Sequence, residues 1–274
     1  MSVALTLALA GLGIPDARAR LGLAAGAATR AGVESVHLDA TLPGLRPREL
    51  DRSARRDLCA ILRRHGVRAS GLDLLIPASH FADPALVDRA AEAVRAAVAL
   101  VAELSALGAL GPGGRIVCVD LQRTADRPVA PGLLEDLGSH ALSVDVYLVD
   151  LSGSIAQNRE SSQTAHGSRA DAASVPPGWA LGVDVVALLR RQEDPAAHIA
   201  RVRPACVRLG DVGGGESVRL GRGRLRLDAV AAACAVSAPQ SPCVLDLRGV
   251  ADDPAGLDAL VEASAEAWRA AQGI

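Results

Sequence analysis

Aromatic side chains and lysine are almost missing from this sequence. In 274 residues there are one Phe, one Tyr and two Trp, and apart from histidine every basic residue is arginine. Half of the residues are nevertheless hydrophobic, so Ala, Leu and Val must build the core. The formal net charge of −2 offers no positive surface for nucleic acid or an acidic membrane. We therefore expect no nucleic-acid partner.

Cysteine is scarce, and its spacing argues against a metal or disulfide role. The five Cys are an odd number without Cys-x-x-Cys spacing, which excludes a disulfide framework and a zinc knuckle. Cys118, Cys206 and Cys243 lie in apolar runs, where a free thiol behaves as a small buried hydrophobe. These features favour a reducing, cytoplasmic location.

Long hydrophobic runs are absent as well. No apolar run is long enough to cross a bilayer, so we expect no membrane partner. Residues 1–14 are apolar and precede Ala-Arg-Ala, but they lack the basic start of a signal peptide. We expect this segment to form the first strand of the fold.

Aspartate recurs at the ends of short apolar runs. The runs are roughly 34 residues apart, which is close to the length of one βα unit in a (β/α)8 barrel of ~250 residues. Because Asp is poor inside strands, its place at the end of each run is informative. Parallel strands would bring all these carboxylates to one rim, where α/β barrels keep their chemistry. The runs end at Asp39, Asp73, Asp120, Asp150, Asp184, Asp211 and Asp246.

Expected strands and helices alternate along the whole chain, which predicts the α/β class and a single (β/α)8 barrel domain over residues 1–274. The expected strands are 3–10, 35–39, 67–75, 115–121, 144–151, 179–184, 205–211 and 242–247. The expected helices are 14–31, 47–65, 84–104, 131–142, 196–202, 227–236 and 254–271. Asp83-Pro84, Asp194-Pro195 and Asp253-Pro254 are predicted helix caps.

Two segments leave alternatives open. Residues 152–177 show no firm periodicity, and we favour a short, poorly packed helix between 160 and 173 over a mobile rim loop. The glycines at 213–215 are expected to form a flexible loop rather than an anion-binding nest.

A ring of carboxylates at one rim repels itself unless a cation or protons intervene. A divalent metal is the economical solution, because hard oxygen ligands hold it well. Such a metal polarises a carbonyl while a spare carboxylate takes a proton from the adjacent carbon. That chemistry is aldose–ketose isomerisation or epimerisation of a small sugar or polyol.

The sequence resembles the xylose isomerase-like barrels of the sugar phosphate isomerase/epimerase family. The similarity is best in the second half, and it also covers residues 72–84. The matching segments are Leu-Gly-Val-Asp184 with Asp194-Pro195, Val-Arg-Leu-Gly-Asp211, Leu220-Gly221-Arg222-Gly223 and Cys243-Val-Leu-Asp246. The resemblance implies a barrel fold and metal ligands in the order Glu, Asp, His and Glu from strands five to eight.

All the positions that correspond to these ligands, except Asp184, differ in charge or reach. They read Asp150, Asp184, Arg208 and Asp246, and a family histidine three residues after the strand-six aspartate is Ala187 here. An Arg in place of His removes a ligand and adds a fixed positive charge. Shortening Glu to Asp withdraws each carboxylate by one methylene, which metal geometry tolerates poorly.

Two outcomes follow for the cofactor. In the first, Asp150, Asp184 and Asp246 hold Mg²⁺, Mn²⁺ or Zn²⁺, with Asp211 or water in the remaining position. In the second, which we favour, Arg208 lies among the aspartates as a built-in cation and no metal is bound.

Other polar residues near the predicted rim are candidates for substrate binding. His37 and His80 could donate hydrogen bonds to sugar hydroxyls, although an isolated His is as often a structural residue. Arg208 and Arg248 could grip a phosphate or carboxylate, or pair with neighbouring aspartates. Asp39, Asp73 and Asp120 are expected to be helix caps.

The function expected first is a sugar phosphate isomerase/epimerase-like activity. Asp150 and Asp246 would transfer the proton, and Asp184 would anchor the metal. The alternative is a non-catalytic barrel that binds a ligand or partner with Arg208 in place of the metal. A zinc-dependent nuclease needs several histidine ligands and a basic groove, and neither is visible.

Overall fold

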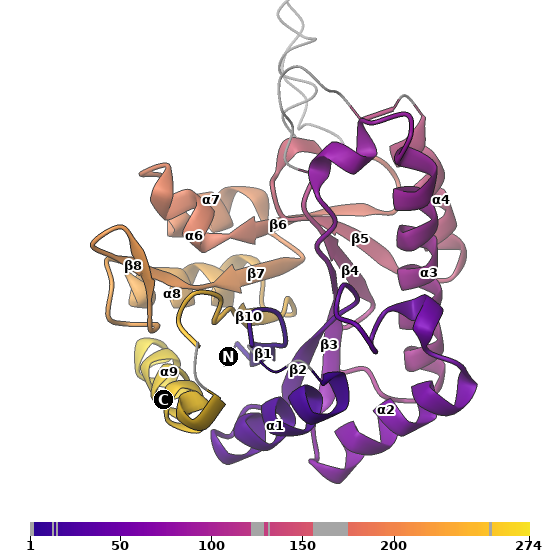
Figure 1. Cartoon of the computed structure of the whole chain (residues 1–274). Coiled ribbons are helices and arrows are strands. Elements are labelled where there is room, and N and C mark those ends of the chain that lie inside the picture. The colour runs from indigo at the N-terminus through magenta and orange to yellow at the C-terminus, as the bar shows by residue number, and fades with distance from the viewer. Residues whose placement is uncertain are drawn as a thin grey trace, which may run out of the picture.

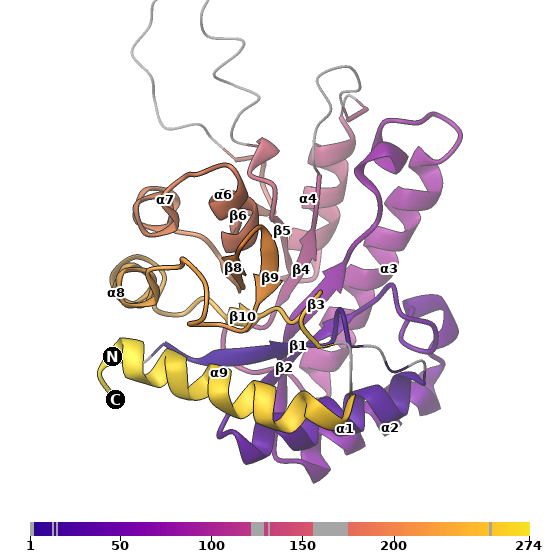
Figure 2. The same cartoon turned by 60° about the vertical axis from the view of Figure 1, so that its left-hand side comes forward.

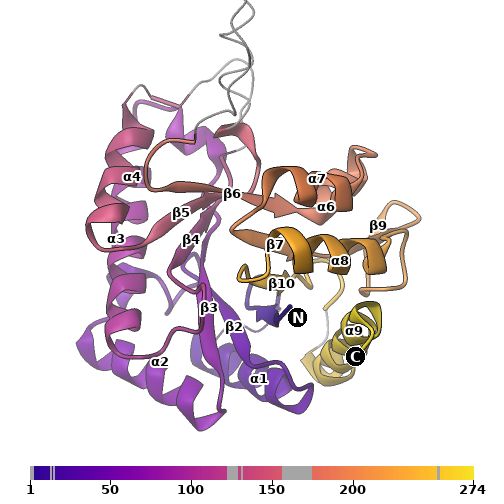
Figure 3. The same ribbon diagram turned by 180° about the vertical axis from the view of Figure 1, so that it is seen from behind.

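The computed structural model describes residues 3–12, 14, 16–121, 129–130, 132–155, 175–251 and 254–274. Parallel strands close into a barrel in the order β1-β10-β7-β6-β5-β4-β3-β2, which confirms the predicted α/β barrel (Figures 1 and 3). The segment expected to be the first strand pairs with β2 and β10, so it closes the ring. The barrel strands are β1 Leu5–Ala8, β2 Ser35–Asp39, β3 Arg68–Leu74, β4 Ile116–Val119, β5 Tyr147–Asp150, β6 Trp179–Asp184, β7 Cys206–Leu209 and β10 Cys243–Leu245.

The helices surround the strands, and α9 runs beside α1 to cover the junction of the two chain ends (Figure 2). Trp268 on α9 donates from its ring nitrogen to the Val3 carbonyl at 3.0 Å, which fastens the last helix to the first strand segment. The α-helices are α1 Ala17–Arg30, α2 Arg52–Arg64, α3 Val87–Ala106, α4 Leu133–Ser143, α6 Val185–Arg190, α7 Pro195–Val202, α8 Leu227–Ser237 and α9 Leu257–Gln272. The 3-10 turns are η1 Pro47–Glu49, η2 Ala78–Phe81 and η3 Pro254–Gly256. Among the described residues, no helix combines the length and apolarity that a bilayer crossing requires.

Aspartates begin several of these helices. The carboxylates of Asp16, Asp51 and Asp194 accept backbone hydrogen bonds from the first turns of α1, α2 and α7, as N-caps do. Asp83 accepts from the Ala85 amide at 2.9 Å, but α3 begins later, at Val87. The predicted cap Asp253 and the helix expected between 160 and 173 lie outside the described residues.

Two elements between β6 and α8 differ from the expectations. A short helix, α6, follows β6 directly, with Asp184 as its N-cap. The glycine segment expected to be a flexible loop forms an antiparallel hairpin instead, from β8 Asp211–Gly213 and β9 Glu216–Val218. Gly214 and Gly215 both have positive φ, at 62° and 93°, as a two-residue hairpin turn requires.

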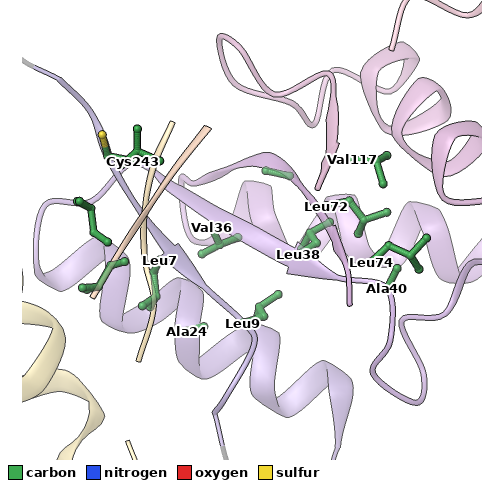
Figure 4. Packing of buried hydrophobic residues seen from close by; sticks show 14 of the residues in the cluster. Leu7, Leu9, Ala24, Val36, Leu38, Ala40, Leu72, Leu74, Val117 and Cys243 are labelled. Carbon is green, nitrogen blue, oxygen red and sulfur yellow. The ribbon is translucent and has the colours of Figure 1, made fainter. Parts of the chain in front are cut away.

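Side chains alternate between the two faces of the barrel wall. Leu7 and Leu9 in and just after β1, Val36 and Leu38 of β2, and Ala24 of α1 belong to the large cluster between strands and helices (Figure 4). A second, smaller cluster lies inside the ring and contains Ala8, Cys118, Val149, Cys206 and Val244. All five cysteines are free and buried, as predicted for those in apolar runs.

The two clusters show on which face of the barrel wall several strand-end aspartates lie. Every second side chain of a strand points to the same face. Asp73 and Asp246 each lie two residues after a position that faces the barrel interior, so both face the interior too, as Asp184 does. Asp150 follows the inward Val149 by one residue and therefore faces outward. Asp211 lies beyond the end of β7, at the first position of β8.

Candidate functional site

Arg208 of β7 is the centre of the polar group inside the barrel. Its side chain is 1% exposed, and its guanidinium reaches two aspartates from different strands. Nη1 donates to Asp73 Oδ1 at 2.5 Å, and Nε donates to Asp246 Oδ2 at 2.9 Å. A guanidinium cannot lose its proton in a protein, so the two carboxylates meet a permanent positive charge.

The carboxylates respond to that charge. Burial by itself raises the pKa of Asp73, but attraction to Arg208 and His37 outweighs it and leaves that pKa well below its usual range. For Asp246 the balance has the same sign, because burial is outweighed by Arg208 and by hydrogen bonds from Arg248, and its pKa is lowered. Burial lowers the pKa of Arg208, yet the two aspartates more than compensate and raise it. All three groups are therefore ionised at neutral pH.

Arg248 extends the group towards the solvent. Its Nη2 lies 2.6 Å from Asp246 Oδ2, and its Nε also donates to Asp246. The same Nη2 is 4.0 Å from Asp184 Oδ2. Charges of opposite sign thus alternate from Asp184 through Arg248, Asp246 and Arg208 to Asp73. The outer end of this line is exposed, while Arg208 and Asp73 are buried.

His37 of β2 joins the inner end of the line. Its Nδ1 lies 3.0 Å from Ser70 Oγ, which lies 2.8 Å from Thr6 Oγ1. Its Nε2 lies 3.4 Å from Asp73 Oδ1 without hydrogen-bonding geometry. Gly71 leaves the space for this ring, because a Cβ there would come within 2.7 Å of His37 Cε1.

Three buried polar atoms of this group have no hydrogen-bond partner among the described residues. They are His37 Nε2, Asp73 Oδ2 and Arg208 Nη2, on three residues that touch one another. Buried polar atoms are normally satisfied, so this part of the barrel is the most polar and least compensated region of the described interior.

Asp150 and Asp211 bind the loops that follow them. Asp150 accepts hydrogen bonds from the hydroxyl and amide of Ser152, the hydroxyl of Ser154 and the amide of Ile155. Asp211 accepts from the backbone amides of Val212, Gly221, Gly223 and Leu225. Both carboxylates are buried, and neither forms a described contact with Arg208 or Asp246. Asp39 resembles them, since it accepts from the amide and hydroxyl of Thr41.

An open cavity of about 490 Å³ lies at the rim beside Arg248. Asp184 and Asp246 line it with Arg248, and the β8–β9 hairpin contributes Glu216 and Ser217. The side chains of Asp184 and Asp246 are 25% and 10% exposed, so both carboxylates reach this space. Asp150 does not line the cavity, and His80 lines a different one on the far side of β3.

The structure thus brings together five of the predicted site residues. Asp184, Asp211, Asp246 and Arg248 line one cavity, and Arg208 contacts Asp246 from below. His37 is close to Arg208 but completely buried, and it is reached through Asp73. The assignment of Asp73 as a helix cap is wrong, because its carboxylate binds Arg208 and His37. The sequence signal that could have revealed these contacts is the inward direction of the Asp73 side chain, which it shares with His37.

The residues present do not fit a divalent metal at the position that the resemblance implies. Of the four corresponding residues, Asp150 is bound by its own loop, and Asp184 caps α6 by accepting a hydrogen bond from the Ala187 amide. The fourth, Asp246, already accepts a hydrogen bond from Arg208, the residue at the third position. One further set, His37, Asp73 and Cys118, has ligand atoms within 4.8 Å of one another. Asp73 of this set already accepts a hydrogen bond from the Arg208 guanidinium. A hydrogen bond with Cys206, together with burial, raises the pKa of the Cys118 thiol. A thiolate is the form that binds metals, so this set is a poor site as well.

Comparison with known proteins identifies the fold. No protein-family model matches the sequence, and no curated protein matches it either. Among solved structures, a xylose isomerase domain protein from Alicyclobacillus acidocaldarius is similar with a TM-score of 0.68 and 14% identity, over 98% of this chain and 99% of that one. An L-ribulose 3-epimerase is similar with a TM-score of 0.66 and 17% identity, over 100% of this chain and 94% of that one. A D-allulose 3-epimerase from Methylomonas sp. reaches a TM-score of 0.67 at 15% identity, over 99% and 100% of the two chains.

These similarities define the class of the structure as a xylose isomerase-like (β/α)8 barrel, which confirms the predicted resemblance at the level of the fold. Its structural neighbours are xylose isomerase domain proteins and sugar 3-epimerases.

Proposed function

We propose that this protein binds a small sugar or polyol in the rim cavity between β6 and β10, with Arg208 in place of a divalent metal. One observation carries the proposal. The guanidinium of Arg208 bridges Asp73 and Asp246 at the position where the family resemblance implies a metal-binding histidine. It supplies the positive charge that the inward carboxylates need.

The cavity has the size and chemistry for such a ligand. Its volume of about 490 Å³ lies within the ~300–1,000 Å³ usual for small-molecule sites. The carboxylates of Asp184 and Asp246 accept hydrogen bonds from hydroxyl groups, and Arg248 donates to an oxygen of the ligand. Solved neighbours include a D-psicose 3-epimerase with D-tagatose and a D-allulose 3-epimerase with D-allulose.

A metal-assisted isomerase or epimerase is the second candidate. It is favoured by the epimerase neighbours and by the two carboxylates, Asp184 and Asp246, that line one cavity. It requires a metal to displace Arg208 from Asp246, and it requires a base. The lowered pKa of Asp246 makes that carboxylate a weak base, so binding is the better-supported function. The predicted proton transfer between Asp150 and Asp246 stays a prediction.

The test is calorimetric titration of the purified chain with D-allulose, D-tagatose, D-fructose and L-ribulose, with EDTA and with Mn²⁺. We expect at least one of these sugars to bind equally well under both conditions, without epimerised product in a chromatographic assay. Asp184→Asn should weaken binding about tenfold, because it replaces a charged acceptor.

Asp194→Asn is the matched control for Asp184→Asn. Both residues are helix N-caps, Asn caps as well as Asp, and Asp194 lies outside the cavity. Failure of all four sugars to bind would overturn the proposal. Binding and turnover that both require Mn²⁺ would replace it by the epimerase candidate.

A further inference from the structure

A second cavity, of about 420 Å³, lies on the opposite side of the rim, next to the ends of β2 and β3. The turns η1 and η2 and one side of helix α3 enclose it, on the side of the barrel where Figure 1 shows α3. It shares no lining residue with the cavity beside Arg248. We call it the α3 pocket.

The walls of the α3 pocket are mainly apolar. Leu74 and Ile76 come from the end of β3 and the segment after it, and Leu86 precedes α3. Helix α3 presents Ala90, Ala93 and Ala96, at intervals of three residues, on the side that faces the pocket. Larger side chains at these positions would fill the space. Such walls suit an apolar ligand body and offer few partners to the hydroxyl groups of a sugar.

The charged side chains that line the α3 pocket are all basic. Arg46, Arg48 and Arg89 line it together with His80, and no acidic residue is among the lining residues. The carboxylate near these arginines is Glu49, which is 3.2 Å from Arg46 and 4.0 Å from Arg48. In the part of the chain that the structure describes, Arg89 forms no ion pair or hydrogen bond. Positive charge therefore exceeds negative charge here, although the whole chain carries −2.

We propose that the α3 pocket binds a medium-chain aliphatic carboxylate, with the hydrocarbon between β3 and α3 and the carboxylate among the three arginines. Arginine forms strong, charge-assisted hydrogen bonds with carboxylates. The apolar walls provide the driving force for the hydrocarbon. The site is separate from the sugar-binding cavity, and its ligand differs in charge and polarity.

The experiment is a titration of the full chain with octanoate, followed by calorimetry. Two related probes isolate the contributions: octanol has the same hydrocarbon without charge, and acetate has the charge without the hydrocarbon. We expect octanoate to bind at least tenfold more tightly than either. Equal binding of octanol would show that the arginines do not recognise the ligand, and would overturn the proposal.

Paired variants locate the binding. Arg89→Gln should weaken octanoate binding about tenfold, whereas Arg56→Gln, an exposed arginine on α2 outside the pocket, should leave it unchanged. Ala93→Leu should abolish binding by filling the pocket, whereas Ala99→Leu, exposed on the same helix, should not. Equal effects within either pair would place octanoate elsewhere and overturn the proposal.

Two further readouts separate this proposal from other occupants and from the sugar site. Saturating octanoate should leave sugar binding at the other cavity unchanged, and Asp184→Asn should leave octanoate binding unchanged. Sedimentation velocity tests whether a second copy of the chain covers the pocket. If the chain forms a dimer that Ala93→Leu dissociates and that octanoate leaves intact, the pocket serves self-association. That result would overturn the proposal.

Discussion

Two pairs of strand-end aspartates satisfy their charges in different ways. Asp73 and Asp246 face inward and share the guanidinium of Arg208, which comes from a third strand. Asp150 and Asp211 are instead surrounded by amides and hydroxyls of the loops that follow them. The first pair depends on tertiary structure, and the second depends mainly on neighbours in the chain. Only the first pair forms ion pairs that a ligand at the rim can rearrange.

The largest effect should come from removing the shared cation. Arg208→Leu leaves two buried carboxylates without a positive partner, and we expect a loss of about 3–5 kcal/mol in the free energy of unfolding, measured in urea. The control is Arg30→Leu, because Arg30 pairs with Asp258 at an exposed position. Breaking that pair should cost less than about 1 kcal/mol.

The triple variant Arg208→Leu, Asp73→Asn and Asp246→Asn sharpens the same test. It removes the cation and both charges together, so it should recover more than half of the stability lost in the single variant. Equal stability of Arg208→Leu and its control would mean that the inward aspartates do not depend on Arg208.

A smaller loss is expected from the second pair, Asp150 and Asp211. Asp211→Asn leaves at least one of the amides of Gly221, Gly223 and Leu225 facing a donor instead of an acceptor. We expect a loss of about 2–3 kcal/mol in the free energy of unfolding. Asp228→Asn, at an exposed position in the first turn of α8, should change it by less than about 0.5 kcal/mol. If the Asp211→Asn loss matches this control, the backbone cage is not what holds the loop.

The pair that shares Arg208 should also make the stability of the fold depend on acid. The pKa values of Asp73 and Asp246 are lower in the folded state than in the unfolded chain. Their stabilisation is thus complete above the unfolded value of ~3.9 and is lost as the pH falls towards the folded values. Asp39 acts in the opposite direction, because burial raises its pKa in the folded state.

Urea midpoints measured between pH 5 and pH 2.5 check this prediction. The unmodified chain should lose stability steadily over that window, and the triple variant should lose distinctly less. Identical slopes for the two proteins would remove Asp73 and Asp246 from the explanation of acid sensitivity.

The smallest effect is expected from metal ions. With Arg208 between Asp73 and Asp246, saturating Mn²⁺, Mg²⁺ or Zn²⁺, or EDTA, should shift the midpoint of thermal unfolding by less than about 1 °C, since only a ligand that binds the folded state stabilises it. Elemental analysis of the purified chain should find no stoichiometric metal. A stabilisation of several degrees by one of these ions would contradict the role given to Arg208.

Much of the fold could be predicted because it depends on local patterns. The βα repeat and the capping Asp194 follow from periodicity and turn chemistry, and the structure has both. The hairpin β8–β9 could not be separated from a loop, because its strands are only three residues long and are joined by Gly214-Gly215. Helix α6 was missed because its short apolar run directly continues that of β6.

The site was less predictable than the fold. Parallel barrel strands are apolar on both faces, so their sequence does not show which residues point inward. In the sequence, Asp150 and Asp246 are therefore equivalent strand ends. In the structure, Asp150 binds its own loop and Asp246 binds Arg208. The contact between Arg208 and Asp73 joins residues 135 positions apart.

By itself, the sequence determined that this chain forms an alternating α/β barrel with an Ala-, Leu- and Val-rich core, and that a guanidinium accompanies the aspartates of its strands. Only the tertiary structure decided which aspartates meet it and which cavities form at the rim. The physical reason is that local propensity sets each strand and helix, whereas the direction of a side chain inside a closed ring depends on the register of all strands together.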